Sequence, residues 1–495
     1  MRITSVGLRN FKAFGPSEQT APLGKRLTLI FGPNSAGKSS ILQSLLLLRQ
    51  SWASEPSIVS LNPQGTFVDL GRAGNLVHGH TGEAFSIGVG GFWLSSQSSA
   101  GREFGLTSFT FGSNSVGSQN DVALQWSSTL EQIHVKAEAR EWVWNVLDAD
   151  VDTDSAGPDA SLNLETSPPF WARKAEDANP VASEAHDLQA LLGGAAPPAR
   201  GILRVRDRQT RASLEGTAIP NGQEIDALTR RLLALRGPAE ASLNRYLESE
   251  FQQHVLGVRD AVGVVKHIGQ ARAPGKRIYE LDTTAGRNHV GRQGEHVAEM
   301  LFNDGELLVT TNELLALIEA GVQLRFNPSL RTASTAVELL AEPDGANVLV
   351  TLCDVGSGIA QVLPVLVQYA HEAKAALRGE SGILWVEQPE LHLHPRMQAL
   401  LLRLLLQPAD AAIRPQIVFE THSEIIVTAL RQIVSDGNLN ASDVRILWVE
   451  RAEDGQSFIT DLQLNEDGGF GRPWPRGYFS ERLDIGTGRI SWSGS

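Results

Sequence analysis

A glycine-rich segment near the N-terminus constrains the fold more than any other feature of this chain. Residues 32–39 fit the pattern G-x-x-x-x-G-K-[ST], which surrounds a phosphate group with backbone amides and a lysine. The segment follows an apolar run at residues 27–31 and precedes residues 39–50, which are rich in leucine and lack glycine and proline. This order predicts a buried strand, a phosphate-binding loop and a helix whose N-terminus faces the phosphate. The residues expected to contact the ligand are Gly32, Pro33, Asn34, Ser35, Ala36, Gly37, Lys38, Ser39 and Ser40.

A second motif supplies the acid that such a site requires. Residues 382–386 are apolar and lead into Glu387, which is the arrangement of a Walker B strand with its carboxylate on the magnesium side. We expect Lys38 to contact the β- and γ-phosphates of ATP, and the Ser39 hydroxyl and Glu387 to bind Mg²⁺. Glu387 follows Lys38 by about 350 residues, which is too long a gap for one compact P-loop domain. The spacing therefore predicts an ATPase split into two lobes around an insertion.

Two further segments predict groups close to the nucleotide. An apolar strand ends directly before His422, where a histidine can sense the γ-phosphate. Between the lobes, a strand expected at residues 348–352 leads into Gly356, Ser357 and Gly358, which form a glycine–serine turn in front of an apolar helix. Because a helix N-terminus attracts phosphate, the chain would carry two phosphate-facing helix ends. The second has a purpose if it faces the nucleotide of another copy, so we expect a homodimer or a higher oligomer of dimers.

The insertion between the lobes has three parts of different composition. Glycine and β-forming residues dominate residues 65–135, which predicts an antiparallel sheet beside the first lobe. Residues 148–200 are rich in aspartate and proline and indicate an irregular loop. A calcium-binding EF-hand would need a glycine and a glutamate at positions where this segment has neither. Residues 223–256 return to helix formers, interrupted by Gly237 and Pro238, which predicts a short helical hairpin.

The charge distribution limits the ligands of the chain. It has 43 basic and 56 acidic residues and a net charge of −13, which argues against a protein that coats DNA through its general field. Arginines concentrate between Arg200 and Arg236, and this segment is the best candidate for a nucleic-acid or partner surface. The simpler competing interpretation is a solvated charged face.

Cysteine usage and apolar runs indicate the compartment. A single cysteine, Cys353, excludes an internal disulfide framework and a zinc site with several cysteines. The sequence opens at Met1 without the apolar region of a signal peptide, and its longest apolar runs fall far short of the ~20 residues that cross a bilayer. We therefore expect a cytoplasmic protein without a membrane domain.

Several further segments together carry a family resemblance. They are Asn10-Phe11-Lys12-Ala13-Phe14, Ala271-Arg272-Ala273-Pro274 with Val290-Gly291-Arg292-Gln293-Gly294-Glu295, Glu387-Gln388-Pro389-Glu390-Leu391-His392-Leu393-His394-Pro395, Glu420-Thr421-His422-Ser423-Glu424, and the tail Trp474-Pro475-Arg476-Gly477-Tyr478-Phe479. With these motifs the chain resembles the OLD-like ATPases of the SMC/RecF clan, which are ABC-type ATPases. The tail resembles a small C-terminal domain of one bacterial subgroup. The resemblance covers roughly residues 1–90 and 260–485, whereas residues 95–260 match no family pattern.

The resemblance implies roles for several of these residues. Residues 354–361 would form the ABC signature, residues 391–395 the D-loop with His394, and His422 would be the switch histidine. A metal site formed by His392, His394 and His422 is the alternative, but the family pattern already gives two of these histidines other roles.

Two positions depart from the family pattern. Ala360 stands where many relatives have serine, and Gln388 stands where a hydrolytic ABC protein has its catalytic glutamate. Glutamine orients a water molecule but cannot take its proton. Hydrolysis is therefore expected to be slow or absent unless Glu390 or Glu387 supplies the base.

The predicted architecture is an α/β, ABC-type P-loop ATPase head split into two lobes, with a β-rich flank and an inserted helical or irregular domain. The N-terminal lobe with Walker A is expected at residues 1–92 and the insertion at residues 93–260. The C-terminal lobe, with the signature, Walker B, D-loop and switch histidine, is expected at residues 261–430. A small C-terminal domain would occupy residues 431–495.

Several functions are compatible with these motifs. We favour an ATPase whose ATP-driven dimerisation gates a partner, which in bacterial relatives of this kind is often a nuclease or toxin of antiviral defence encoded nearby. A nucleotide-dependent scaffold that does not hydrolyse ATP is the alternative, and Gln388 is the main argument for it. A DNA repair or recombination ATPase is a further alternative. A nuclease like full-length OLD proteins would need a Toprim domain, for which the roughly 70 residues after Ser423 leave no room.

Overall fold

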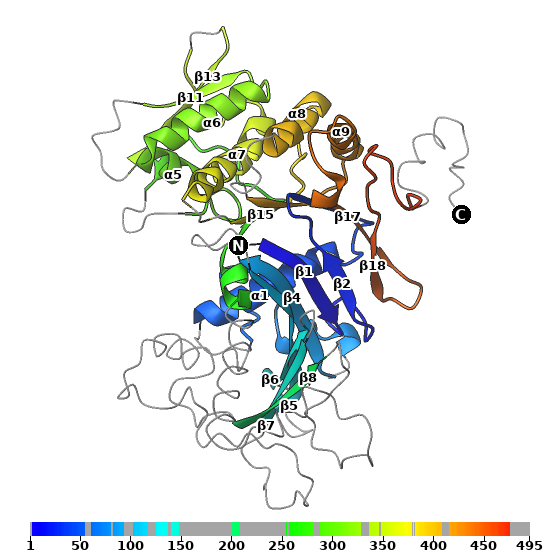
Figure 1. Ribbon diagram of the computed structural model, residues 1–495. Helices are drawn as coiled ribbons and strands as arrows, with labels where there is room; N and C mark the ends of the chain where they lie inside the picture. The colour runs from blue at the N-terminus through cyan, green and yellow to red at the C-terminus, as the bar shows by residue number, and fades with distance from the viewer. Residues whose placement is uncertain are drawn as a thin grey trace, which may run out of the picture. The chain divides into compact units, whose positions relative to one another are not determined.

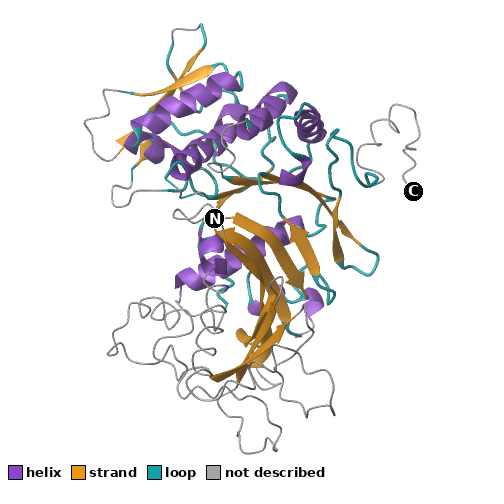
Figure 2. Ribbon diagram, viewed as in Figure 1, coloured by secondary structure: helices purple, strands orange, loops and turns teal. Residues whose placement is uncertain are grey.

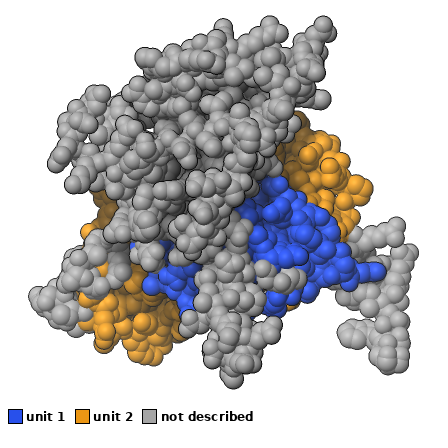
Figure 3. Space-filling model, turned by 90° about the horizontal axis from the view of Figure 1, so that it is seen from below, with its two compact units in different colours: residues 1–21, 39–264, 451–458 blue, residues 22–38, 265–450, 459–495 orange. Residues whose placement is uncertain are grey.

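The computed structural model describes most of both ends of the chain and less of its middle. The described residues are 2–54, 61–80, 83–93, 102–116, 125–136, 140–147, 200–207, 254, 257–281, 288–327, 336–345, 348–378, 380, 382–407 and 415–475. The chain divides into two compact units, coloured separately in Figure 3. Unit 1 consists of residues 1–21, 39–264 and 451–458, and unit 2 of residues 22–38, 265–450 and 459–495. The domain boundaries expected at residues 92, 260 and 430 stay a prediction.

Unit 1 is built on a seven-stranded sheet with the order β2-β1-β4-β5-β6-β7-β8. Its strands are β1 (Arg2–Arg9), β2 (Gln19–Pro22), β4 (Phe85–Trp93), β5 (Arg102–Val116), β6 (Gln125–Lys136), β7 (Arg140–Leu147) and β8 (Arg200–Asp207). All pairings from β1 to β8 are antiparallel. Along β4 the alternate side chains Phe85, Ile87 and Val89 are fully buried, as the two-residue period of a strand requires. The antiparallel sheet predicted from residues 65–135 is confirmed.

Helix α1 (Lys38–Ser54) follows the glycine-rich loop and belongs to unit 1 from Ser39 onward. Ile41, Leu45 and Leu48 recur at helical spacing and are fully buried, which fixes the buried face of the helix. Two short 3₁₀ helices, η1 (Ala73–Leu76) and η2 (His78–His80), precede β4.

Much of the predicted insertion lies outside the described residues. This holds for the irregular loop before Arg200 and for nearly all of the helical hairpin expected at residues 223–256. Of the arginine-rich segment between Arg200 and Arg236, the structure describes the backbone of β8 and nothing beyond it. The tail motif is described as far as Pro475.

Unit 2 contains a six-stranded sheet with the order β18-β17-β3-β16-β15-β9. Its strands are β3 (Leu27–Phe31), β9 (Val265–Ile268), β15 (Ile383–Glu387), β16 (Gln416–Glu420), β17 (Val444–Arg451) and β18 (Ser457–Asp461). The pairings of β17, β3, β16, β15 and β9 are all parallel. Every residue of β3 and β16 is buried, as expected of central strands covered on both faces. The three strands predicted before Gly32, at Glu387 and before His422 are all present.

In the described part of unit 2, helices α5 to α9 accompany this sheet, and Figures 1 and 2 show their arrangement. They are α5 (Val297–Asn303), α6 (Gly305–Leu317), α7 (Ser357–Ala376), α8 (Pro395–Leu406) and α9 (Glu424–Ser435). Helix α7 contacts β15 and α6, and α8 packs against α9. Leu366 of α7 shares one buried core with Val386 of β15 and Phe419 of β16.

Smaller elements complete unit 2. Strands β11 (Val322–Phe326), β13 (Leu339–Pro343) and β14 (Val350–Thr351) form a three-stranded sheet, and β10 (Tyr279–Glu280) pairs with β12 (Ala336–Val337). The 3₁₀ helix η7 (Ala441–Asp443) precedes β17. No helix in the described part of the chain combines the length and apolarity needed to cross a membrane.

Candidate nucleotide site

The parallel register of unit 2 gathers the predicted site residues at one edge of its sheet. Ile30 of β3 pairs with Glu420 of β16, and Glu420 pairs with Glu387 of β15. The glycine-rich loop, His422 and Gln388 each follow one of these three neighbouring strands. Because all three strands run in the same direction, their carboxyl ends meet at the same edge, where open α/β sheets bind ligands.

The glycine-rich loop has the backbone conformation of a phosphate cradle. Gly32, Ser35 and Gly37 adopt positive φ angles of 146°, 61° and 99°. A side chain at Gly32 would also collide with the Val449 carbonyl oxygen of β17, so only glycine fits there. Turns that mix left- and right-handed residues point successive N–H groups into one concavity, and α1 begins directly after this one. The loop therefore fits a phosphate group.

Lys38 is buried, and its ammonium group turns back onto the loop. Its Nζ donates hydrogen bonds to the carbonyl oxygens of Gly32 and Pro33, both at 2.8 Å. Burial lowers the pKa of Lys38, and the nearby carboxylate of Glu420 partly opposes this shift. The ammonium is thus held over the loop that would receive a phosphate, with a counter-charge on the neighbouring strand.

Glu387 ends β15 and is paired with a histidine from β9. Glu387 Oε1 lies 2.7 Å from His267 Nε2. The two side chains meet because Val386 of β15 pairs with Ile268 of β9, so the ends of these two strands are neighbours. Burial opposes ionisation of Glu387, but the hydrogen bond and charge of His267, together with the charge of Arg292 and the Gln270 N–H, lower its pKa. Glu387 is therefore held as a carboxylate, the form that binds a divalent cation.

Gln388 and Glu420 lie side by side at the strand ends. The Gln388 N–H donates to the main-chain oxygen of Glu420 at 2.6 Å, and Gln388 has a φ of 44°, which a non-glycine residue rarely adopts. The Glu420 carboxylate is buried and accepts a hydrogen bond from Trp385 Nε1 at 3.0 Å. The turn after β15 is thus fixed by its neighbouring strand.

Glu390 reaches the segment that carries the predicted switch histidine. Its Oε1 accepts a hydrogen bond from the His422 N–H at 2.9 Å. Burial raises the pKa of Glu390 above that of a free glutamate. Burial, with the charge of Lys38, lowers the pKa of His422 and favours the neutral imidazole. Glu390 and His422 are therefore a candidate base and a neutral hydrogen-bonding group beside the same strand end.

The predicted signature opens helix α7 and meets the predicted D-loop. Gly356 and Ser357 are exposed, and among the described residues no side-chain hydrogen bond caps the helix N-terminus. A side chain at Gly358 would approach the main-chain oxygen of His392 to 2.8 Å, so this glycine permits the close contact between the two segments. The D-loop residue His394 caps α8, where its Nδ1 accepts from the Arg396 N–H at 3.3 Å.

Arg272 connects the signature helix with the end of β15. Its guanidinium donates to the main-chain oxygens of Gln361, Glu387 and Gln388 at 3.1, 2.6 and 3.2 Å. Burial lowers the pKa of Arg272 to about 10, against the opposing charges of Glu390 and Glu387. The arginine remains a cation at neutral pH.

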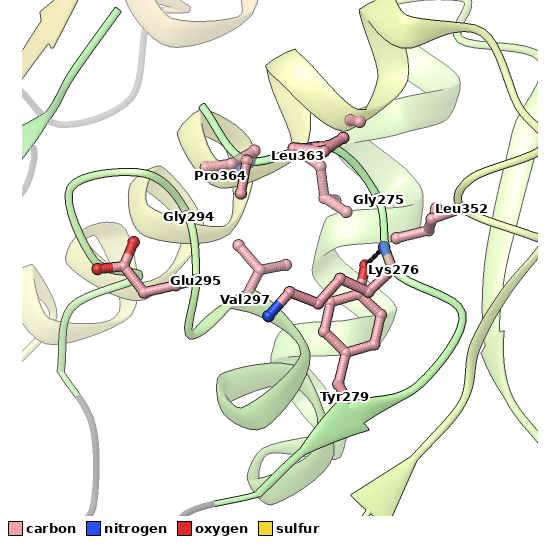
Figure 4. A pocket seen from close by; sticks show the side chains of 12 residues that line it. Gly275, Lys276, Tyr279, Gly294, Glu295, Val297, Leu352, Leu363 and Pro364 are labelled. Atoms are coloured by element: carbon pink, nitrogen blue, oxygen red, sulfur yellow. Dashed lines mark hydrogen bonds between the residues drawn. The ribbon is translucent and has the colours of Figure 1, made fainter. Parts of the chain in front are cut away.

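A pocket lies beside the first turns of α7 (Figure 4). One wall is formed by Gly275, Lys276 and Tyr279, and the Tyr279 hydroxyl accepts from the Lys276 N–H at 2.9 Å. Leu363 and Pro364 of α7 line the opposite wall. The segment that follows Arg272 therefore packs incompletely against the helix.

Some groups at this edge had no role predicted from the sequence. His267 and Glu387 are separated by 120 residues, and no spacing rule links them. Arg272 belongs to a motif of the resemblance, but only the structure shows what it contacts. Among the residues that the structure describes, no three His, Cys, Asp or Glu side chains are grouped to hold a metal ion. His392, His394 and His422, the alternative metal site, are among the described residues and do not form such a group.

Comparison with known proteins identifies a family. The model of the family described as "AAA domain, putative AbiEii toxin, Type IV TA system" matches residues 83–428, which is more than half of the chain. A second model, described as "AAA domain", matches residues 5–48, including the glycine-rich loop. No curated protein matches the chain. The OLD-like subgroup and the C-terminal motif stay predictions.

Several solved structures of SMC heads show weak similarity. An SMC head bound to the C-terminal winged-helix domain of ScpA is 11% identical to this chain, with a TM-score of 0.44. The match covers 93% of this chain and 98% of the SMC head. The SMC head domain from Thermotoga maritima is 10% identical, with coverages of 94% and 100% and a TM-score of 0.39. An SMC head from Pyrococcus furiosus, bound to the C-terminal domain of ScpA, is 13% identical, with coverages of 99% and 100% and a TM-score of 0.40.

Proposed function

Because this chain belongs to the AAA-domain family described as putative AbiEii toxins of type IV toxin–antitoxin systems, we propose that it is an ATP-dependent switch. In this proposal ATP binding drives two copies together, and the dimer gates an effector partner. The observation that carries it is the meeting of the glycine-rich loop, Glu387 and His422 at one edge of a parallel sheet. Few other ligands need a phosphate cradle, a buried lysine and a carboxylate together.

The residues present fit ATP with Mg²⁺. The loop amides and the N-terminus of α1 would hold the phosphates, with Lys38 supplying a positive charge. The Ser39 hydroxyl and the Glu387 carboxylate would hold Mg²⁺, which supplies charge neutralisation on the β- and γ-phosphates when bound. Gln388 would orient a water molecule, Glu390 is the candidate base, and His422 would contact the γ-phosphate.

The exposed N-terminus of α7 supports the dimeric part of the proposal. Its uncapped N–H groups and the helix dipole favour a phosphate, and Ser357 adds a hydroxyl. A second copy would bring its nucleotide to this end, as in an ABC dimer. The interface would then form only when ATP is present, which is what a switch requires.

The family description is compatible with a protein partner. Toxin–antitoxin systems are pairs of proteins, and a nucleotide-gated member would act on, or with, its cognate partner. The partner's class, a nuclease or toxin of antiviral defence, is part of the proposal. Co-purification with the product of the neighbouring gene, with and without ATP, tests it: a partner retained equally in both conditions would contradict ATP gating.

A scaffold that binds ATP without hydrolysing it is the second candidate. The observation in its favour is that Gln388, an amide, stands at the position where the family resemblance places the catalytic glutamate. Phosphate release over many turnovers separates the two candidates.

Lys38→Ala tests the nucleotide site itself. We expect the variant to lose ATP binding, because the loop has no other buried cation for the phosphates among its own residues, while the melting temperature changes little. Binding is measured with a fluorescent ATP analogue, and association by light scattering. Lys25→Ala is the matched control, since Lys25 precedes the same strand and its side chain is 67% exposed. Equal ATP affinity in the Lys38 variant and wild type would disprove the site.

A further inference from the structure

We propose that Arg272 is a positioning residue that couples the signature end of α7 to the end of strand β15. The inference rests on the proposed ATP-dependent dimer, because it explains how contact of one copy with the signature would reach the water-orienting residues of the same chain. Arg272 would touch neither nucleotide nor water. It would act through the main-chain atoms that it holds.

The hydrogen bonds of Arg272 are unusual for a buried charge. The residue is 5% exposed, and buried arginines normally pair with a carboxylate. Here the guanidinium instead donates to three main-chain oxygens, one on Gln361 of α7 and two on consecutive residues, Glu387 and Gln388. A rigid planar fork can hold both elements at once. The cation is thus used as a connector between α7 and the turn after β15.

The connection between Arg272 and α7 runs in both directions. Arg272 Nη1 donates to the main-chain oxygen of Gln361 at 3.1 Å. In return, Gln361 Nε2 donates to the main-chain oxygen of Arg272 at 3.3 Å. Directly after Arg272, the pocket in Figure 4 interrupts the apolar packing against α7. Beside this pocket, the hydrogen bonds of Arg272 add a directional connection between α7 and the end of β15 to the apolar packing of their shared core.

The charge of Arg272 belongs to the same edge of the sheet. Glu387 and Glu390 both stabilise its cationic form. The arginine therefore contacts the main chain of the residues after β15 and also feels the carboxylates proposed to bind Mg²⁺ and to act as base. A shift of the guanidinium would change the position of Gln388 and the field at Glu390 together.

The hydrogen bonds between Arg272 and Gln361 leave one donor and one acceptor of these two side chains unpaired. Arg272 Nε and Gln361 Oε1 are buried, and neither has a hydrogen-bond partner among the described residues. The two spare atoms belong to the two residues that already tie α7 to β15. A movement of α7 that brings these two atoms together would add a hydrogen bond between the same two residues.

Arg272→Lys tests the coupling, because lysine keeps the charge but lacks the planar fork. We expect ATP affinity within about threefold of wild type, whereas ATP-driven association and phosphate release each fall at least about tenfold, within the usual range of coupling between sites. Arg325→Lys is the matched control, an exposed arginine of β11 that lies 2.7 Å from Glu342. Affinity is measured with a fluorescent ATP analogue, association by light scattering, and folding by thermal melting.

A second variant guards against misfolding of the first. Gln361→Met removes the bond from Gln361 Nε2 to the Arg272 main-chain oxygen and leaves the bond from Arg272 to the main-chain oxygen of residue 361, so we expect a smaller loss of association and turnover in the same direction, with ATP binding retained. Wild-type association and turnover in both variants would overturn the proposal. A parallel fall of ATP affinity and melting temperature in both would also overturn it, since that is the result of a purely structural role. If wild-type protein itself neither associates nor releases phosphate with ATP, the proposed function fails, and the coupling with it.

Discussion

At the residue scale, Gln388 is held in a left-handed conformation directly after the carboxylate that is proposed to bind magnesium. Its main chain is fixed on one side by the Glu420 carbonyl and on the other by the Arg272 guanidinium. A residue held from two sides is well placed to orient a water molecule, but an amide cannot accept its proton. The nearest candidate to do so is Glu390, whose pKa is raised by burial.

Gln388→Glu asks whether the missing carboxylate limits hydrolysis. If no base acts in wild type, we expect phosphate release to rise by about 10²–10⁴-fold, the usual contribution of one positioned base. Steady-state phosphate release from both proteins decides it, with Gln432→Glu at an exposed position of α9 as the control and thermal melting as the check on folding.

The opposite result is equally informative. If Glu390 already acts as the base, a second carboxylate nearby would repel it, and turnover would stay level or fall. Wild-type turnover should then increase as pH rises through the pKa of Glu390, because only the ionised carboxylate accepts a proton and burial moves this pKa upward. A wild-type rate already above about 1 s⁻¹, within the normal enzyme range, would contradict slow hydrolysis.

What the sequence can predict at this scale depends on whether contacting residues are neighbours in the chain. Gly32, Lys38 and Ser39 lie within one continuous motif whose chemistry is set by local backbone geometry, so they were predictable. His267 and Glu387 meet only because β9 and β15 are adjacent in the sheet. No local pattern in one sequence reports such a pairing.

At the scale of elements, the continuous apolar runs of β3, β15 and β16 predicted buried strands, and the structure confirms all three. The strand expected at residues 348–352 is reduced to β14, two residues long. A run of leucine and valine there is compatible with a strand, but Val348 and Leu349 are 56% and 48% exposed, and the pairing with β13 begins at Val350. Helix α7 was expected from its apolar face, and its core residues are buried.

Ser357→Arg tests the N-terminus of α7 as the face that meets a second copy. An arginine side chain there would occupy the space in front of the helix, so we expect ATP-driven association to be lost while each monomer still binds ATP. Light scattering with and without a slowly hydrolysed ATP analogue measures this. Ser435→Arg, at the exposed last residue of α9, is the matched control, because a cation suits a helix C-terminus. Equal masses for wild type and the Ser357 variant with ATP would count against the interface.

At the scale of the whole molecule, each unit combines distant parts of the chain. The strand before the glycine-rich loop lies between β16 and β17, although more than 380 residues separate them in sequence. The long interval between the two motifs predicted a split ATPase, but it could not show which strands enclose β3. Strand order is decided by packing across the entire sheet, and the turn motifs of a single sequence do not encode it.

The last described segment of the chain packs against the strand that leads into the loop. The Trp474 ring contacts Phe31 edge-on with centroids 5.7 Å apart, and it also lies 4.7 Å from Phe470. Phe31 directly precedes Gly32. The C-terminal segment is therefore part of the support of the phosphate-binding loop.

Trp474→Ala measures this support. Removing a large, partly buried aromatic side chain should lower the melting temperature by about 2–6 °C and weaken ATP binding, because Phe31 loses a packing partner. Trp474→Phe, which retains a ring, should recover most of both losses. Thermal melting and titration with a fluorescent ATP analogue give the two values. Unchanged ATP affinity in the alanine variant would show that the C-terminal segment packs against unit 2 without supporting the phosphate-binding loop.

The position of β3 also has a consequence for how the protein is made. Residues 27–31 emerge from the ribosome early. Their hydrogen-bonding neighbours in β16 and β17 are synthesised more than 380 residues later. At about 5–20 residues per second, this apolar segment waits roughly 20–80 s before its place in the sheet exists. During that interval it is an apolar strand without its partners, and unpaired strands are prone to aggregate. The strand that leads into the glycine-rich loop therefore gains its two neighbours only late in translation.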